Sequence, residues 1–436
     1  MIVDQLFNKR SDGSSAERTD LSREFIPRPP QNLRESGLTE GIIEALTLKF
    51  LLNRTNATGM EIARQLKLPF KMMEEELRRM KREQFIAHRN SSQMHDYVYE
   101  LTPNGYELAH RLSKISTYFG SSPVPFSSYV DSVNRQKLDG TGVTPEKLKS
   151  VLRGLSIQPE FFQQVGQAIR AARGLFLFGS PGNGKTTIAE RICQSFGPRI
   201  WVPRTLLVDG ELIRVYDPTV HREIAVKAEA PIDHRWVCIE RPTVVAGGEL
   251  TLENLELTKI GDTGVVEAPL QLKSNCGVLV IDDFGRQRCS PTDLLNRWIV
   301  PLEMKVDYLN LPSGKKLKTP FEQMIVFSTN LKPRELVDEA FLRRIPYKVE
   351  ARNPNPTEFL RLLQSTATAM QIQYDDAHGK YMLSKYFGPD LRELRYCHAR
   401  DLMLQVKNAC EFQGRPPAFE PDIVDQAIRN YFVDME

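Results

Sequence analysis

The sequence predicts an α/β fold in which helices cover both faces of a parallel sheet. Three stretches of the chain support this prediction. An apolar strand, a glycine-rich loop and a helix follow one another from Gly174. A continuous apolar run further on ends in two carboxylates, Asp282 and Asp283, and another ends in Asn330. Uninterrupted apolar runs are typical of buried parallel strands, and ligands bind at the carboxyl ends of such strands.

The composition is that of a globular protein with two or three domains. Of the 436 residues, 26% are charged and 41% are hydrophobic, and the net charge is +3. This near balance argues against a strongly basic nucleic-acid coat but leaves room for a local basic face. The first twenty residues lack the apolar stretch of a signal peptide, and no run reaches the length of a membrane span. We therefore expect a cytoplasmic protein without membrane insertion, whose six scattered cysteines are reduced thiols.

The N-terminal quarter of the chain is expected to contain a small helical domain. Residues 1–35 are rich in Ser, Arg, Asp and Pro and are predicted to be flexible. Residues 36–117 have the outline of a winged helix-turn-helix, and residues 118–144 are predicted to be a linker. The expected helices cover 39–53, a segment from 59 that Thr58 and Glu61 cap, 70–83 and 102–113, with a strand over 96–101. The apolar residues expected in its core are Ile62, Leu66, Leu68, Leu77 and Met80.

Residues 145–355 form the predicted α/β domain. Short alternating runs indicate a β-rich insertion within it, over about 201–275, where Asp209-Gly210 predicts a hairpin turn. Residues 356–436 are predicted to be a helical C-terminal lid.

The glycine-rich loop matches the phosphate-binding pattern G-x-x-x-x-G-K-[ST] without deviation. Glycines let the backbone wrap closely around phosphates, the lysine supplies charge to the β and γ oxygens, and the hydroxyl of Thr186 reaches Mg²⁺. The strand before the loop and the helix after it are the context that this motif requires. The residues expected to bind the nucleotide are Gly179, Ser180, Pro181, Gly182, Asn183, Gly184, Lys185, Thr186 and Thr187.

The acidic strand end predicts the remaining chemistry. In that position Asp282 is expected to hold the Mg²⁺ shell together with Thr186, and Asp283 to orient and polarise the attacking water. Asn330, at the end of the next strand, is placed to hydrogen-bond the γ-phosphate or the water, although asparagine also closes strands as a turn residue.

Two later groups of arginines are candidates for contacts with phosphate. Arg343 and Arg344 follow the Asn330 strand at a distance that can place one of them at a subunit edge, where an arginine supplied in trans stabilises the transferring phosphoryl group. The stretch from Gly388 to Arg395 is expected to open a helix, from which Arg392 would reach the phosphates. Solvated surface arginines are the alternative for both groups.

From Pro145 to the C-terminus, the order of these motifs resembles the AAA+ ATPases. By that resemblance Asp282 is the Walker B metal ligand and Asn330 is sensor 1. Arg344 is the arginine finger, with Arg343 as its substitute. The Leu391–Arg395 segment is similar to the sensor 2 segment of bacterial enhancer-binding activators, which points to Arg392, with Arg395 as the alternative.

Two features refine the resemblance. Most AAA+ motors have Asp-Glu where this chain has Asp282-Asp283, and Asp-Asp-x-Gly is similar to the helicase-loader and transposition-helper branch, which hydrolyses ATP. The segment 294–303 and the turn near Pro312 resemble a branch in which loops inserted before sensor 1 project into a central pore to touch the client. Bacterial chaperone-like ATPases associated with pilus assembly share this outline.

Three functions follow from this reading. The first is a remodelling ATPase that binds ATP and Mg²⁺ at the subunit interfaces of a homo-oligomeric, hexamer-like ring and acts on a protein or nucleoprotein client. The second is an ATP-controlled regulator that binds DNA through the winged helix, whose recognition helix mixes cations and acids (Lys71, Glu74, Glu75, Glu76, Arg78, Arg79, Lys81 and Arg82). The third is a nucleotide switch that does not hydrolyse ATP, favoured only by the shorter carboxylate at Asp283.

Overall fold

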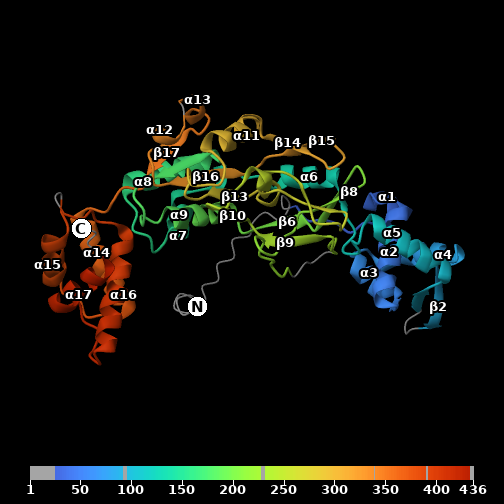
Figure 1. Cartoon of the computed structure of the whole chain (residues 1–436), viewed down its shortest axis with the longest axis horizontal. Helices are drawn as coiled ribbons and strands as arrows, with labels where there is room; N and C mark the ends of the chain where they lie inside the picture. Colours follow the sequence, from blue (N-terminus) through green and yellow to red (C-terminus); the bar gives the residue numbers. More distant parts are fainter. Residues whose placement is uncertain (1–24, 92–95, 227–230, 338, 389–390, 433–436) are drawn as a thin grey trace.

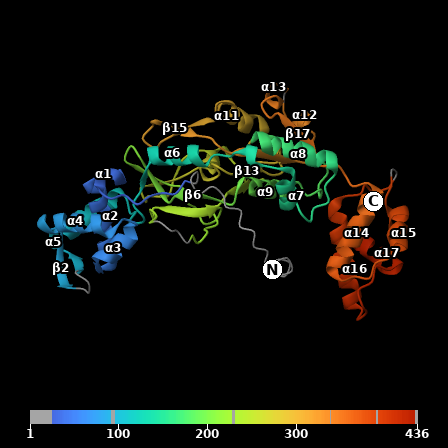
Figure 2. The ribbon, with the colours of Figure 1, turned by 180° about the vertical axis from the view of Figure 1, so that it is seen from behind.

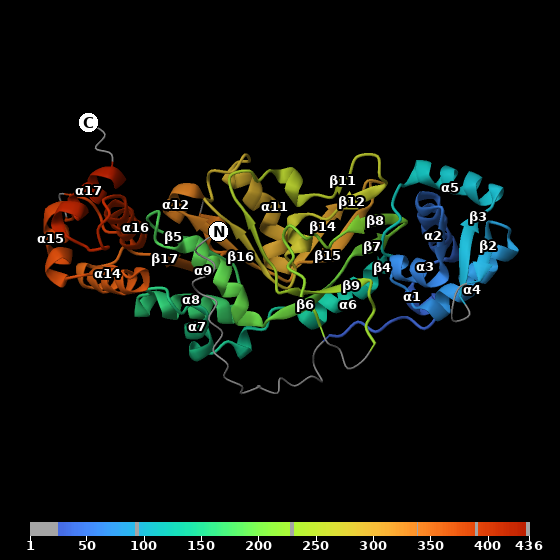
Figure 3. The ribbon, with the colours of Figure 1, turned by 90° about the horizontal axis from the view of Figure 1, so that it is seen from below.

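The computed structural model describes residues 25–91, 96–226, 231–337, 339–388 and 391–432. The molecule is elongated, with an N-terminal module at one end, a helical lid at the other and the parallel sheet between them (Figure 1). Figure 3 shows these parts in a row, with the insertion strands between the sheet and the N-terminal module. None of the helices in the described ranges has the length and apolarity that crossing a bilayer requires.

The N-terminal module packs helices around a three-stranded antiparallel sheet of order β1-β3-β2. Its elements are α1 (Leu33–Ser36), α2 (Glu40–Arg54), β1 (Asn56–Thr58), α3 (Gly59–Leu66), α4 (Phe70–Arg82), β2 (Ile86–Ser91), β3 (Tyr97–Leu101) and α5 (Pro103–Ile115). The predicted capping box is present, because the Thr58 hydroxyl accepts a hydrogen bond from the Glu61 amide at 3.1 Å. The five apolar residues expected in the core are buried together. That this module has a winged-helix fold stays a prediction.

The segments expected to be flexible or linking carry structure where they are described. Residues 1–24 lie outside the described residues, but Phe25 is 8% exposed and packs edge-on against Trp236 with 5.4 Å between ring centroids. In the predicted linker, β4 (Val124–Pro125) pairs with a strand of the insertion, and α6 (Phe126–Gln136) buries Tyr129 and Val133. The prediction was wrong there because Ser, Gly and Pro residues obscured apolar side chains that recur at helical spacing.

The central sheet is parallel throughout and has the order β10-β13-β16-β5-β17. Its strands are β5 (Leu175–Phe178), β10 (Thr243–Ala246), β13 (Val278–Ile281), β16 (Met324–Thr329) and β17 (Tyr347–Glu350). Side chains alternate between the two faces, so that Leu175 and Leu177 enter one core while Phe176 enters the other. The sequence prediction of a parallel sheet covered on both faces is therefore confirmed.

Helices cover each face of this sheet. The helices α7 (Pro145–Val151), α8 (Pro159–Ala171) and α9 (Lys185–Ile192) pack on one face, where Val165, Ile169 and Ile188 are buried. The opposite face is covered by α11 (Pro291–Met304), whose Trp298 is fully buried against Phe327. Two short helices, α12 (Pro333–Leu336) and α13 (Glu339–Leu342), follow β16 on that side.

The β-rich insertion differs from its prediction in one respect. The strand β10 lies inside the predicted 201–275 range but pairs in parallel with β13, so it belongs to the central sheet. Outside the central sheet, the insertion strands join β4 of the predicted linker in a second sheet of order β11-β12-β8-β7-β4, and β6 and β9 form a ribbon. A further ribbon, of β14 and β15, follows α11 and lies outside the predicted range. Their bounds are β6 (Arg199–Pro203), β7 (Thr205–Val208), β8 (Glu211–Arg214), β9 (Trp236–Glu240), β11 (Thr258–Lys259), β12 (Val265–Glu267), β14 (Val306–Asn310) and β15 (Lys316–Pro320).

The Asp209-Gly210 turn joins β7 and β8 as predicted. Both residues have positive φ angles, of 48° and 85°, as a two-residue type I′ hairpin requires. The lid is a separate helical unit with its own core, formed by α14 (Pro356–Met370), α15 (Asp376–Tyr386), α16 (Tyr396–Phe412) and α17 (Pro421–Tyr431).

A buried ion pair ties the N-terminal module to the insertion. The Arg235 and Asp233 side chains are 5% and 2% exposed and lie 2.8 Å apart. Arg235 also donates to the backbone oxygens of Ser36 at 2.9 Å and Pro123 at 3.2 Å. One guanidinium thus joins three separate segments of the chain.

Replacing Arg235 with alanine is expected to destabilise this joint by about 3–5 kcal/mol, because it leaves the Asp233 carboxylate buried without its opposite charge, with only the backbone amide at position 235 donating to it. Thermal unfolding of the full chain measures the effect. The matched control is Arg222→Ala, which removes an ion pair with Glu240 whose side chains are 81% and 50% exposed, and should cost less than about 1 kcal/mol. Equal melting temperatures for the two variants would contradict the assignment.

Candidate nucleotide-binding site

The glycine-rich loop closes tightly between β5 and α9. Its three glycines, Gly179, Gly182 and Gly184, have φ angles of 138°, 84° and 74°, a region that side chains with a Cβ rarely adopt. A Cβ on Gly179 would also lie 2.5 Å from the backbone oxygen of Ala351. The pattern of glycines in the motif therefore matches positions where the backbone permits no other residue without strain.

Lys185 lies at the centre of the site and is 7% exposed. Its Nζ donates to the backbone oxygens of Gly179 and Ser180, both at 3.0 Å, and to Oδ1 of Asn330 at 2.7 Å. Burial lowers the pKa of this amine, and the carboxylates of Asp282 and Asp283 oppose that shift. The Lys185 amine is thus hydrogen-bonded to three oxygen atoms that phosphate oxygens can replace, near the carboxylates of Asp282 and Asp283.

The two carboxylates that end β13 have different partners. The Thr186 hydroxyl donates to Oδ2 of Asp282 at 2.9 Å. The Asn330 amide nitrogen donates to Oδ1 of Asp283 at 3.1 Å. Asp283 adopts a left-handed φ of 48°, a conformation that aspartate tolerates better than most residues. The three predicted strand ends therefore meet in one network that runs from Lys185 through Asn330 to Asp283.

A hydroxyl and a carboxylate at this distance suit a magnesium ion. Mg²⁺ prefers hard oxygen ligands, keeps several waters and is held in nucleotide sites by one or two protein groups together with phosphates. Thr186 and Asp282 provide such a donor pair next to the loop. In the described part of the chain, no group of three or more His, Cys, Asp or Glu side chains gathers as an independent metal site.

Asn183 connects the loop to the lid, a role that the sequence did not reveal. Its side chain is 5% exposed and donates to the Ala351 oxygen at 2.9 Å and to Oδ1 of Asn353 at 2.8 Å. Its Oδ1 accepts from the Tyr396 amide at 3.3 Å, and the Cys397 amide donates to the Gly182 oxygen at 2.9 Å. The partners of the Asn183 side chain lie 168 to 213 residues away along the chain, so no local pattern signals them.

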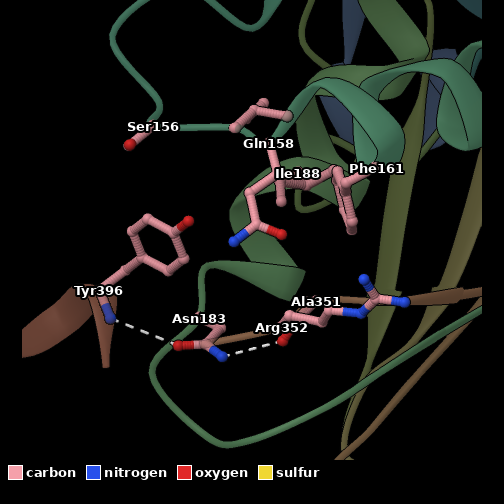
Figure 4. Close-up of a pocket in the computed structure, with 9 residues that line it drawn as sticks. Ser156, Gln158, Phe161, Asn183, Ile188, Ala351, Arg352 and Tyr396 are labelled. Atoms are coloured by element: carbon pink, nitrogen blue, oxygen red, sulfur yellow. Dashed lines mark hydrogen bonds between the residues drawn. The ribbon is translucent and has the colours of Figure 1, made fainter. Parts of the chain in front are cut away.

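A pocket opens beside Asn183, and Figure 4 shows its lining. Tyr396 from the lid faces Gln158, which directly precedes α8, and Ile188 of α9. The lining combines apolar groups with a few polar ones, which is typical of sites that bind small molecules. The lining residues are Ser156, Ile157, Gln158, Phe161, Asn183, Ile188, Ala351, Arg352 and Tyr396.

The lid arginines are arranged differently from the expectation. The predicted helix does not begin near Gly388, because α16 starts at Tyr396. Arg392 lies over the Phe432 ring, with its guanidinium carbon 4.8 Å from the ring centroid. Arg395 is the residue just before α16, its Nε is buried without a hydrogen-bond partner among the described atoms, and its charge lowers the pKa of Lys185. The alternative residue, Arg395, is therefore the lid arginine beside the phosphate loop.

The paired arginines lie at the other end of the sheet. They precede β17, and the neighbouring Ile345 packs at the start of β5, near Gly174, whereas the phosphate loop follows the end of that strand. Arg344 donates to Oε1 of Glu303 at 2.6 Å, with 18% of its side chain exposed. Arg343 is exposed. The structure does not bring either arginine to the phosphate loop of its own chain.

Two arginines of α4 form ion pairs with acidic residues of the N-terminal module. Arg79 is 17% exposed and lies within ion-pair distance of four carboxylates, those of Glu40, Glu44, Glu76 and Glu83. Arg78 pairs with Glu74. Two of the five cations expected to face DNA are therefore neutralised by acids of the same module, which weakens the case for this helix as a DNA reader.

Comparisons with known proteins agree with this geometry. A family described as "Domain of unknown function (DUF8689)" matches residues 355–430, which hold most of the lid. Spastin of Anopheles gambiae is 24% identical over 277 residues, which cover 63% of this chain and 27% of spastin. An "AAA ATPase forming ring-shaped complexes" from Kocuria rhizophila is 34% identical over 76 residues, or 17% of this chain and 12% of that protein.

The chain thus spans about a quarter of the length of the first of these relatives. Among solved structures, the Thermotoga maritima RuvB Holliday junction branch migration motor matches with a TM-score of 0.38 and 16% identity, covering 65% of this chain and 74% of that one. The phosphate loop, the acidic strand, the five-stranded parallel sheet and the similarity to AAA ATPases together support an AAA+ ATPase fold for this part of the chain.

Proposed function

We propose that this chain hydrolyses ATP between the subunits of a homo-oligomeric, hexamer-like ring and uses the energy to remodel a protein or nucleoprotein client. The observation that carries the proposal is the network of Lys185, Asn330 and Asp283, which brings three strand ends to one point beside a phosphate loop. The relative named for forming ring-shaped complexes supports the ring.

Each residue of the network has a role in this proposal. Lys185 exchanges its oxygen acceptors for the β and γ oxygens of ATP. Thr186 and Asp282 would hold Mg²⁺, which would supply positive charge beside the phosphates. Once Lys185 turns to phosphate, Asn330 is released to contact the γ-phosphate or the water. Asp283 then accepts a hydrogen bond from the attacking water and orients it in line with the phosphorus.

The pocket beside Asn183 is proposed to bind the adenine ring. It adjoins the phosphate loop through Asn183, and its wall is completed by Tyr396 from the lid. Binding of the base would therefore bring lid and sheet together, and Arg395, at the start of α16, would then approach the phosphates.

Replacing Asp283 with asparagine is expected to lower ATP turnover by about 100-fold or more, because the amide is a poorer acceptor for the proton of water. ATP binding should be retained, since Lys185 and Thr186 are unchanged. Steady-state phosphate release, measured across protein concentration, tests this, with Asp262→Asn in an exposed turn as the control. Turnover that is equal in Asp283→Asn and the wild type would refute the role of Asp283. Turnover that is absent in the wild type would favour the nucleotide switch instead.

A further inference from the structure

A short turn joins the acidic strand end to a helix that covers the sheet. The chain leaves β13 after Ile281 and enters α11 at Pro291, and this helix lies above β13 in both views of the molecule (Figures 1 and 2). Within the turn Phe284 is 1% exposed, and its amide donates to the Ser328 oxygen at 2.7 Å. Asp283, by contrast, is exposed and has a left-handed φ of 48°. This conformation costs free energy for a residue with a Cβ, so neighbouring contacts must hold the backbone in place.

The side chain of Gln287 binds the backbone of this turn with both ends of its amide. Its Nε2 donates to the backbone oxygen of Asp282 at 2.8 Å and to that of Asp283 at 3.3 Å. Its Oε1 accepts from the Gly285 amide at 2.8 Å. Gln287 is half-buried, and its Nε2 also reaches the oxygen of Gly247, the residue after β10, at 3.5 Å. One side chain therefore fixes the backbone on both sides of the Asp283 carboxylate.

The Asp283 carboxylate depends on this support most when ATP is bound. Its Oδ1 accepts a hydrogen bond from the Asn330 amide nitrogen at 3.1 Å. In the proposed function Asn330 turns to the γ-phosphate or the water, so this contact is lost when the nucleotide binds. The direction of the carboxylate then follows from the backbone of the turn, which Gln287 holds at two points. An error of about 1 Å in the position of such a group can lower a rate about 100-fold.

We propose that Gln287 is a positioning residue for ATP hydrolysis, which fixes the direction of the Asp283 carboxylate toward the attacking water. The inference rests on the proposed function and adds to it a residue that contacts neither the nucleotide nor the water. Gln287 acts through backbone atoms of the turn, whereas ATP is bound through Lys185 and Thr186 of the phosphate loop. Its loss should therefore slow the chemical step and leave ATP binding unchanged.

The test is steady-state phosphate release by the full chain, with kcat and KM for ATP determined separately. Gln287→Met keeps the length of the side chain but removes the amide donor and acceptor. It should lower kcat by about tenfold or more, while KM stays within about twofold of the wild-type value. The matched control is Gln136→Met, because Gln136 holds the backbone of Trp201 with both ends of its amide, at 2.9 and 2.6 Å, in the core of the insertion. This control should keep the wild-type kcat.

A double-mutant cycle separates positioning from general stability. In an Asp283→Asn protein the carboxylate that Gln287 positions is gone, so adding Gln287→Met should change kcat by less than about twofold. Two residues that act independently would instead lower kcat by the product of their separate effects, and that result would overturn the inference. If Gln287→Met is unfolded at the assay temperature, Gln287→Asn replaces it in the cycle. Its amide is one methylene shorter and cannot reach both ends of the turn, so the same fall in kcat is expected.

The wild-type protein reports on the proposed function by itself. If it releases no phosphate at any protein concentration, the proposed function is wrong and this inference falls with it. If the wild type is active and Gln287→Met has a normal kcat, or a raised KM with kcat unchanged, the inference alone is wrong. An equal loss of kcat in Gln136→Met would also overturn it, because the effect would then be that of any broken backbone clamp.

Discussion

Replacing Lys185 with alanine is expected to lower ATP turnover by about 100- to 1000-fold and to abolish measurable nucleotide binding at micromolar protein. The reason lies in the charges around this amine. It is 7% exposed and interacts electrostatically with the carboxylates of Asp282 and Asp283, so its removal leaves two negative groups where the triphosphate must bind. Isothermal titration with ATP and steady-state phosphate release measure the two effects.

The control for this variant must lose a lysine without touching the site. Lys147→Ala on the exposed side of α7 satisfies that condition and should keep wild-type values. A Lys185→Ala protein that still binds and hydrolyses ATP normally would show that the phosphate loop of this chain is not the working site. Thermal unfolding should accompany both assays, because loss of the contacts to Gly179, Ser180 and Asn330 also loosens the loop.

The paired arginines are expected to act on a neighbouring subunit. Removing both, in Arg343→Ala/Arg344→Ala, should lower turnover by about 1000-fold or more, the usual worth of an arginine that stabilises the transferring phosphoryl group. The geometry supports action in trans, because both arginines lie at the start of the sheet strands and the phosphate loop lies at their ends. ATP binding by the double variant should stay close to that of the wild type.

Mixing two inactive proteins tests this arrangement directly. Lys185→Ala keeps the arginines and lacks a working loop, while the double arginine variant has the opposite defect. Mixed rings should recover turnover, since a complete site forms wherever an arginine from one protein meets a loop from the other. A mixture as inactive as its components would argue for a role within one chain.

Single variants then separate the two arginines. Arg344 is bound to Glu303, so Glu303→Gln should reproduce part of the Arg344→Ala defect if that ion pair only supports the fold. Arg343 is exposed and has no such contact with a described carboxylate.

Much of the fold was predictable from short stretches of sequence. The parallel sheet follows from apolar runs that end in polar residues, and the capping box of α3 and the hairpin at Asp209-Gly210 follow from residues a few positions apart. That Thr186 and Asp282 lie together was also expected, because the two motifs place them at adjoining strand ends, where both would hold Mg²⁺. The boundary of the insertion could not be predicted, because the sequence of β10 resembles those of the neighbouring strands and only its pairing with β13 sets it apart.

The amino-acid sequence by itself determined which residues form the phosphate loop and the acidic strand, because their chemistry and spacing are local. Only the tertiary structure decided that Asn183 joins the loop to the lid, that Arg395 lies beside Gly182 of the loop while Arg392 lies over Phe432, and that Arg344 is paired with Glu303. The physical reason is the same in each case. These side chains meet partners that are distant along the chain, and such contacts depend on how whole elements pack rather than on any pattern within one of them.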